Sequence, residues 1–213
     1  SGVWRAWNWW LWKGDAQGAA DLLEPYAGLG IDAVAVLHAF YLYLARDYEG
    51  SLAVLDRMPE DFYSNQFYAI SKDLNRAFLL RALGREDEAS AAAEQAVATI
   101  EASVLANPGD PRMHAALGQA YAFVGREEEA VREAERAVKL QPISSDALEG
   151  PAKLVDMAVT YTLLGRAEGA CQALDQVLAS QSGLTSVAAV EATPEYDSLR
   201  QAPCYKSLIE KYK

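Results

Sequence analysis

The residues that most often catalyse reactions or bind metal ions are few and scattered in this sequence. The two histidines, His38 and His114, and the two cysteines, Cys171 and Cys204, lie far apart along the chain. Zinc sites and nucleophile–base pairs usually show more ligands at closer spacing. We expect both histidines to be packing residues of helices. The cysteines are expected to be buried, inert thiols, with a disulfide or redox role as the alternative.

One glycine-rich stretch has the letters of a nucleotide-binding motif. Residues 28–33, Gly-Leu-Gly-Ile-Asp-Ala, match the glycine spacing of a dinucleotide fingerprint. That fingerprint works only where it follows a β-strand, whereas the preceding residues 19–23 have a helical pattern. We therefore expect residues 28–33 to end one helix and lead to the next. Since no phosphate loop or nucleophile elbow occurs either, the sequence predicts no cofactor and no enzyme.

Composition and charge predict a helical protein that repels nucleic acid. The 213 residues include 39 alanines and 25 leucines, both strong helix formers, and the formal net charge is −11. Surplus acidic groups repel phosphate backbones, so no direct nucleic-acid partner is expected. The longest apolar run, residues 33–45, is shorter than the roughly 20 residues that span a bilayer, so no membrane insertion is expected. The start at Ser1, without an initiator methionine, suggests an internal segment of a longer protein.

A recurring pattern of small and aromatic residues predicts how the helices are arranged. It is clearest in residues 111–142, which contain Leu117, Gly118, Tyr121, Gly125, Ala130, Ala137 and Pro142. Asp110 and Pro111 suit the start of a first helix. Gly118 and Ala130 allow two antiparallel helices to approach closely, and Gly125 suits a left-handed turn between them. This segment strongly resembles the tetratricopeptide repeat family.

Weaker copies of the pattern extend over most of the chain. We expect five helical hairpins, near residues 1–27, 32–59, 70–107, 111–142 and 151–182, the last marked by Tyr161, Gly165 and Ala170. Residues 193–213 break the pattern. Pro194 and Pro203 each suit the first turn of a short helix, so this segment is expected to cap the array. The resemblance implies an all-α fold, a right-handed superhelical solenoid of antiparallel helix pairs over residues 1–192.

A narrower resemblance rests on two segments in the C-terminal half of the chain. Residues 142–151 and 196–203 look like the C-terminal repeat module of bacterial TolB-like, adenylate-cyclase-linked and kinase-linked regulators, and the similarity covers about residues 30–213. It implies the regulatory or scaffolding part of a larger bacterial signalling protein. It also implies a signalling or DNA-binding domain upstream, and it leaves the compartment open between the cytoplasm and the periplasm of a bacterium.

The family resemblance further implies a concave groove lined by the first helix of each hairpin. Family members that clamp a peptide carboxylate use a lysine and an asparagine there, and the matching pairs in this sequence contain no lysine. The candidate partner groove is aromatic with isolated polar groups: Phe40, Tyr43, Phe78, Arg81, Gln119 and Phe123. It favours an extended or helical apolar segment of a protein or peptide, and the chain's own C-terminal cap could equally fill it.

All the tryptophans lie near the start of the chain, and they form a candidate interface patch of Trp4, Trp7, Trp9, Trp10 and Trp12. At about 100° per residue they point around nearly the whole circumference of a helix. A helix that is apolar all round must be covered on more than one side. Burial within this chain, an absent upstream repeat, and a partner or self-association surface are the three interpretations.

These patterns together predict a non-catalytic protein–protein interaction module. The alternative is a dimerisation or structural element built on the tryptophan-rich first helix. An enzyme on a helical scaffold is the third class, and it would need convergent titratable groups, of which the candidate groove holds Arg81 alone. No cofactor and no metal are expected.

Overall fold

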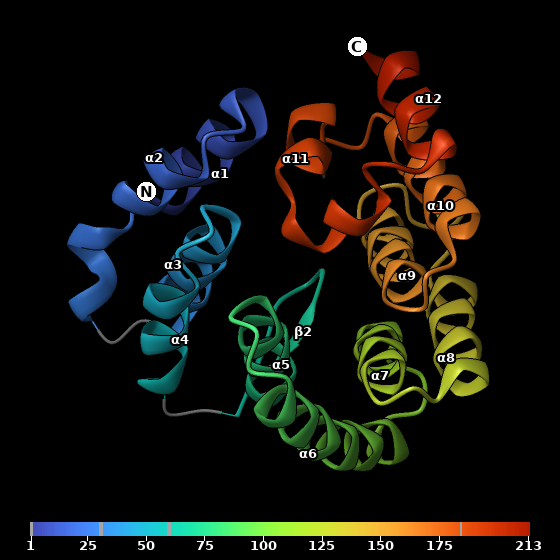
Figure 1. The fold of residues 1–213 in the computed structure, drawn as a ribbon, viewed down its shortest axis with the longest axis horizontal. Helices are drawn as coiled ribbons and strands as arrows, with labels where there is room; N and C mark the ends of the chain where they lie inside the picture. The colour runs from blue at the N-terminus through green and yellow to red at the C-terminus, as the bar shows by residue number, and fades with distance from the viewer. Residues whose placement is uncertain (1, 30–31, 59–60, 184) are drawn as a thin grey trace.

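The structure is a computed structural model that describes residues 2–29, 32–58, 61–183 and 185–213. In these ranges the chain forms successive antiparallel helix pairs: α1 (Gly2–Lys13) with α2 (Ala16–Asp21), α3 (Asp32–Leu44) with α4 (Tyr48–Asp56), α5 (Lys72–Ala82) with α6 (Glu86–Ala106), α7 (Pro111–Phe123) with α8 (Glu127–Leu140), and α9 (Gly150–Leu163) with α10 (Ala167–Ser180). Each pair packs on the next (Figure 1). The predicted all-α helical-repeat solenoid is confirmed.

Small residues allow the helices of a pair to approach closely. Alanines occupy many of the fully buried positions, among them Ala77, Ala93, Ala120, Ala130, Ala137, Ala158 and Ala170. At Gly118 of α7, an added Cβ would lie 3.0 Å from the carbonyl oxygen of Ala130 and 3.1 Å from the backbone nitrogen of Ala134. A larger side chain at this position would therefore push α7 away from α8.

The turns between paired helices depend on a left-handed residue. Four of them use glycine with φ between 63° and 75°: Gly14, Gly84, Gly125 and Gly165. The turn between α3 and α4 instead has Arg46, with φ of 67°. Since a Cβ makes this conformation costly, Arg46 is a local exception with a cost in stability.

The start of α7 shows how the sequence fixes a helix boundary. Pro111 is the first helical residue, and the Asp110 carboxylate accepts a hydrogen bond of 2.9 Å from the backbone N–H of Arg112. Asp110 is thus the N-cap that its residue type predicts. The connection before α9 is also tight, because an added Cβ at Gly150 would lie 2.8 Å from the backbone nitrogen of Ile143.

A short β-hairpin interrupts the helical array between α4 and α5. Strand β1 (Phe62–Ser64) pairs antiparallel with β2 (Ala69–Ser71), and the sheet has these two strands among the described residues. The hairpin is directed towards the inner side of the array, the side that α3, α5, α7 and α9 line (Figure 1). Residues 60–69 lie between two expected helical hairpins, and the expected hairpin 70–107 was wrong at its start, because residues 70 and 71 belong to β2 and α5 begins at Lys72.

The C-terminal residues close the array rather than extend it. They form α11 (Val187–Ala192), the 3₁₀ helix η2 (Pro194–Leu199) and α12 (Pro203–Tyr212). The helix α12 packs on α10, and α11 packs on α1 at the opposite end of the chain (Figure 1). Ala189 of α11 is buried in the same cluster as Ala6 and Trp10 of α1. The solenoid therefore curves far enough for its two ends to meet.

The glycine-rich stretch has no strand before it. Gly28 and Leu29 end a 3₁₀ helix, η1 (Glu24–Leu29), and α3 begins at Asp32. This is not the strand–turn–helix context of a dinucleotide fingerprint. Gly30 and Ile31 lie outside the described residues, as do Ser1 and the final position of the expected hairpin 32–59.

Candidate functional site

Two surfaces of the molecule contain the predicted functional residues, and the first is the outer side of α1. Trp4 and Trp12 are 68% and 76% exposed, and Trp9 is 39% exposed. Trp10 is buried and Trp7 is half-buried. The five tryptophans are thus divided between the core and solvent, so burial within the chain accounts for only part of the cluster.

Two of the exposed tryptophans contact polar neighbours. The Trp9 indole N–H donates a hydrogen bond of 2.9 Å to Asp15, and the Lys13 ammonium lies 4.2 Å from the centre of the Trp12 ring. The rings of Trp4, Trp9 and Trp12 line an open hollow of about 820 Å³. Its other lining residues are Arg5, Asn8, Leu11 and Leu22. We call Trp4, Trp9 and Trp12, with this hollow, the tryptophan face.

The second surface is the inner side of the array, where the candidate groove was predicted. Phe78 of α5 and Phe123 of α7 meet edge to face with 4.7 Å between ring centres, and the Arg81 guanidinium lies 3.9 Å from the Phe123 ring. The Gln119 amide donates a hydrogen bond of 3.1 Å to Asp156 of α9. These four residues therefore contact neighbouring parts of the same chain.

Phe40 and Tyr43 of α3 lie further along and differ in exposure. Phe40 is 39% exposed, whereas Tyr43 packs against Tyr48 with 5.6 Å between ring centres. Burial and the neighbouring Glu195 carboxyl group raise the pKa of Tyr43 well above its usual range. The candidate groove is thus divided, because η2 covers Tyr43 and leaves Phe40 partly accessible.

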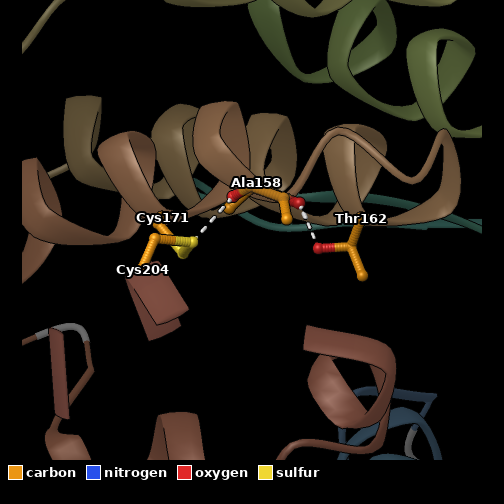
Figure 2. Close-up of a disulfide and its surroundings, with 5 residues drawn as sticks. Ala158, Thr162, Cys171 and Cys204 are labelled. Atoms are coloured by element: carbon orange, nitrogen blue, oxygen red, sulfur yellow. Dashed lines mark hydrogen bonds between the residues drawn. A yellow bond between two sulfur atoms is a disulfide. The ribbon is translucent and has the colours of Figure 1, made fainter. Parts of the chain in front are cut away.

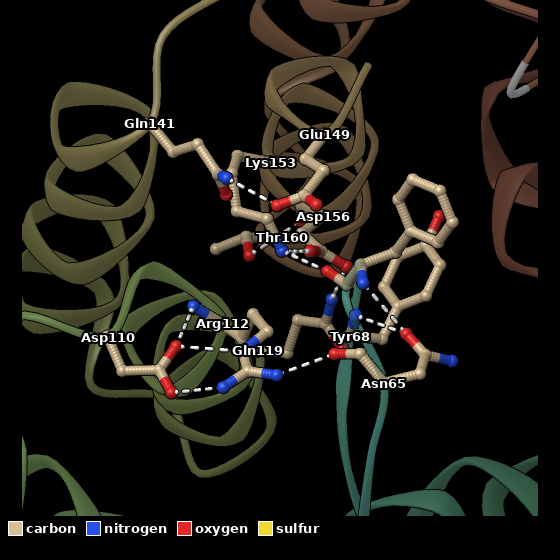
Figure 3. A network of polar contacts seen from close by, with 11 residues as sticks. Asn65, Tyr68, Asp110, Arg112, Gln119, Gln141, Glu149, Lys153, Asp156 and Thr160 are labelled. Carbon is tan, nitrogen blue, oxygen red and sulfur yellow. Dashed lines mark hydrogen bonds and ion pairs between the residues drawn. The ribbon is translucent and has the colours of Figure 1, made fainter. Parts of the chain in front are cut away.

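The tip of the β-hairpin lies against the N-terminal ends of α7 and α9. The Arg112 guanidinium donates a hydrogen bond of 2.6 Å to the carbonyl oxygen of Asn65, and the Lys153 ammonium donates one of 2.5 Å to that of Phe67 (Figure 3). The Asn65 side chain accepts hydrogen bonds from the backbone N–H groups of Phe67 and Tyr68. Sequence analysis missed both cations because neither lies at a groove position of the repeat pattern.

Both cations have a carboxylate of their own. Arg112 forms two side-chain hydrogen bonds to Asp110, of 3.0 and 2.7 Å, and Lys153 lies 3.3 Å from Asp156 (Figure 3). The Lys153 side chain is fully buried. Burial raises the pKa of Asp156, while Lys153 acts in the opposite direction. Each positive charge at the hairpin tip is therefore balanced within its own helix or helix cap.

The 3₁₀ helix η2 packs on α9 and contacts Tyr43 and Arg46 at the end of α3. Tyr196 and Leu199 are buried, and burial raises the pKa of Glu195 to about 7. Asp197 forms a bidentate ion pair with Arg46, with distances of 2.6 and 2.8 Å. The inner side is thus covered by two segments of the chain itself, the hairpin and η2.

The remaining reactive residue types have structural environments. Cys171 of α10 and Cys204 of α12 form a disulfide, with 6.0 Å between their Cα atoms (Figure 2). The expectation of inert thiols was therefore wrong, because α12 folds back far enough along α10 to bring the two side chains together. The sequence could not show this contact between elements that lie 33 residues apart.

The histidines occupy buried positions in helices. His114 lies between two acceptors, with Nδ1 2.6 Å from Glu133 and Nε2 3.0 Å from the carbonyl oxygen of Pro108. His38 is 8% exposed, its Nδ1 has no hydrogen-bond partner among the described residues, and burial lowers its pKa. Both ring nitrogens of His114 thus have a polar partner, whereas the Nδ1 of His38 has none among the described residues.

The described residues contain neither a metal-binding cluster nor a membrane-spanning helix. No group of three or more histidine, cysteine, aspartate or glutamate side chains could hold a metal ion within the ranges that the structure describes. Among the helices in those ranges, none is long and apolar enough to cross a membrane.

Comparison with known proteins agrees with the helical geometry of α7 and α8. No curated protein gave a significant match to the chain. Residues 111–144 match the family model described as Tetratricopeptide repeat. Repeats of this kind generally bind proteins or peptides. This segment also has the glycine turn at Gly125 and the close contact between α7 and α8 at Gly118. Residues 111–144 are therefore a repeat of the tetratricopeptide type.

Proposed function

We propose that the chain is a non-catalytic protein-interaction module that binds its partner through the tryptophan face. The observation that carries this proposal is the exposure of Trp4 and Trp12, 68% and 76%, on one helix. Exposed apolar patches with polar rims usually mark interaction sites, and tryptophan is enriched among residues that dominate binding energy. The candidate groove is a poorer site, since Phe78, Arg81 and Phe123 pack on one another and Glu195 of η2 lies against Tyr43.

The tryptophan face has the composition of a binding surface. Three indole rings surround a hollow whose rim carries Arg5 and Asn8. Arg5 forms no ion pair among the described residues, although the protein as a whole is strongly acidic. An apolar partner surface with a carboxylate opposite Arg5 would satisfy both features.

The biological setting that we propose is a larger bacterial signalling or regulatory protein, in which this module is the regulatory or scaffolding part. The support is the resemblance of residues 142–151 and 196–203 to the C-terminal module of TolB-like and cyclase-linked regulators. A module of this kind would bring a partner to an attached domain without chemistry of its own.

Self-association is a second candidate function, favoured by the same exposed rings. Two tryptophan faces could cover each other, and this would make α1 a dimerisation element. Sedimentation of the intact chain over a range of concentrations separates the two functions. A concentration-dependent dimer that is lost in Trp4→Gln/Trp12→Gln would show that the tryptophan face binds a second copy of the chain and not an external partner.

The test of the proposed function compares two double variants. Trp4→Gln/Trp12→Gln removes the tryptophan face, and Leu105→Gln/Leu148→Gln changes two apolar side chains that are similarly exposed elsewhere, at 82% and 57%. Proteins captured by the intact chain from an extract of its source cells should be lost with the first variant and kept with the second. Equal capture by both variants would exclude the tryptophan face as the binding surface.

A further inference from the structure

We propose that Arg112 and Lys153 form a binding site for a short turn of polypeptide, and that residues 65–68 of the hairpin are a resident occupant that a partner segment of the same chemistry displaces. This site lies on the inner side of the array, away from the tryptophan face. The inference therefore goes beyond the proposed function and does not depend on it.

The contacts at this site are those of peptide recognition. Arg112 and Lys153 donate to backbone carbonyl oxygens of Asn65 and Phe67, and a polypeptide of any sequence offers such oxygens. The Lys153 ammonium also lies 5.4 Å from the centre of the Tyr68 ring. The backbone hydrogen bonds provide binding, while the aromatic ring provides selectivity.

The side chain of Asn65 sets the shape of the occupant. Its amide oxygen accepts hydrogen bonds of 2.8 and 2.9 Å from the backbone N–H groups of Phe67 and Tyr68, and the Asn65 N–H donates to the Tyr68 carbonyl oxygen. Asparagine stabilises tight turns in this way. A competing ligand is therefore an asparagine-led turn followed by two aromatic residues.

The site does not need the hairpin to keep its shape. Arg112 is anchored by Asp110 at the N-cap of α7, and Lys153 by Asp156 on α9. Asp156 accepts a further hydrogen bond from Gln119 of α7, which joins the two helices. Both cations can therefore remain in position when the turn leaves, and a preorganised site binds a new occupant at lower entropic cost.

The hairpin itself is weakly held by its own structure. Its ladder has three residue pairs, Phe62 with Ser71, Tyr63 with Ile70, and Ser64 with Ala69. An isolated two-stranded hairpin is marginally stable at best. Ser64 and Gln66 are exposed, whereas Phe62 and Tyr63 pack against core clusters of the helices and burial raises the pKa of Tyr68. Contacts to α7 and α9 thus contribute much of what keeps the tip in place.

Tethering makes the hairpin a strong competitor. A segment linked to its site has an effective concentration in the millimolar range. A free peptide that binds the empty site with micromolar affinity would therefore bind the intact chain about a thousandfold more weakly. A partner can overcome this competition only if it makes contacts elsewhere as well, and in this way the hairpin would regulate access.

The experiment uses the chain's own hairpin as the probe. In one variant a Gly-Ser linker replaces residues 63–70, and a synthetic peptide with the sequence of residues 61–72 is titrated by calorimetry. The peptide should bind the linker variant and show at least a hundredfold weaker binding to the intact chain. Binding of equal strength to both proteins would overturn the proposal, as would no binding to a linker variant whose circular dichroism shows native helix content.

Matched substitutions identify the site. Within the linker variant, Arg112→Gln should weaken peptide binding by at least about tenfold, because it removes a hydrogen bond from a charged donor. Arg132→Gln, at an exposed arginine of α8, should leave the affinity unchanged. Trp4→Gln/Trp12→Gln should also have no effect, so a failure of this proposal is distinguishable from a failure of the proposed function.

A second measurement applies if the linker variant does not fold. Hydrogen exchange of the intact chain should show the amides of residues 65–68 opening independently of α7 and α9. Exchange of the hairpin amides only together with those helices would mean that the hairpin is a fixed part of the core. The proposal would then be wrong.

Discussion

At the scale of single residues, Arg46 combines a backbone cost with a long-range contact. It has φ of 67° in the turn where the other described helix pairs have glycine, and its guanidinium pairs with Asp197 of η2. The ion pair is about 40% exposed on each side, and exposed pairs contribute up to about 1 kcal/mol. The left-handed conformation of a residue with a Cβ costs a similar amount, about 1 kcal/mol.

Two substitutions of Arg46 separate these effects. Arg46→Gly loses the ion pair and removes the backbone cost, whereas Arg46→Ala loses the pair and keeps that cost. We expect Arg46→Ala to be less stable than Arg46→Gly by about 1 kcal/mol in urea denaturation. Asp197→Asn keeps the turn unchanged and removes this ion pair together with the one between Asp197 and Arg200. Equal stability of the glycine and alanine variants would show that the turn carries no strain.

At the scale of helices, close approach of α7 and α8 depends on Gly118. A leucine there would extend towards backbone atoms of Ala130 and Ala134. We expect Gly118→Leu to lower the free energy of unfolding by roughly 1–3 kcal/mol or more, through overpacking. Gly109→Leu, in an exposed position with no heavy atom closer than 4.0 Å to the added Cβ, is the matched control. A Gly118→Leu protein as stable as that control would contradict this helix contact.

At the scale of the whole molecule, contact between the two ends closes the array. Ala189 of α11 is 4% exposed in the cluster around α1, and the Ser186 hydroxyl donates a hydrogen bond of 3.2 Å to the carbonyl oxygen of Leu11. A solenoid whose ends do not meet has only neighbouring contacts. This closure adds a long-range contact to the first hairpin and should protect it from opening.

A buried charge tests the closure. We expect Ala189→Asp to separate α11 from α1, because an unpaired carboxylate is strongly disfavoured in an apolar cluster. Small-angle scattering should show a larger radius of gyration, and hydrogen exchange of residues 2–21 should become faster. Ala179→Asp, at an exposed position of α10, should change neither. Unchanged scattering with Ala189→Asp would mean that the ends stay together without this contact.

The local features of the fold could be predicted from the sequence. Helix starts at Asp110 and Pro111, the glycine turn at Gly125, and the small residues Gly118 and Ala130 all follow from short-range geometry. These effects act within one hairpin, so the sequence of that hairpin contains the required information. Composition therefore predicted the helices, and the spacing of these residues carried the family resemblance that implies the repeat fold.

Only the tertiary structure decided which surfaces are available. The disulfide between Cys171 and Cys204, the pairing of Arg46 with Asp197, and the hairpin on Arg112 join residues that are 33 to 151 positions apart. Such contacts depend on the accumulated curvature of the whole array, which small rotations at each helix pair determine. The sequence thus identified the tryptophans and the candidate groove residues, but not Arg112 and Lys153. The curvature of the array places the hairpin and η2 on its inner side and leaves Trp4 and Trp12 exposed.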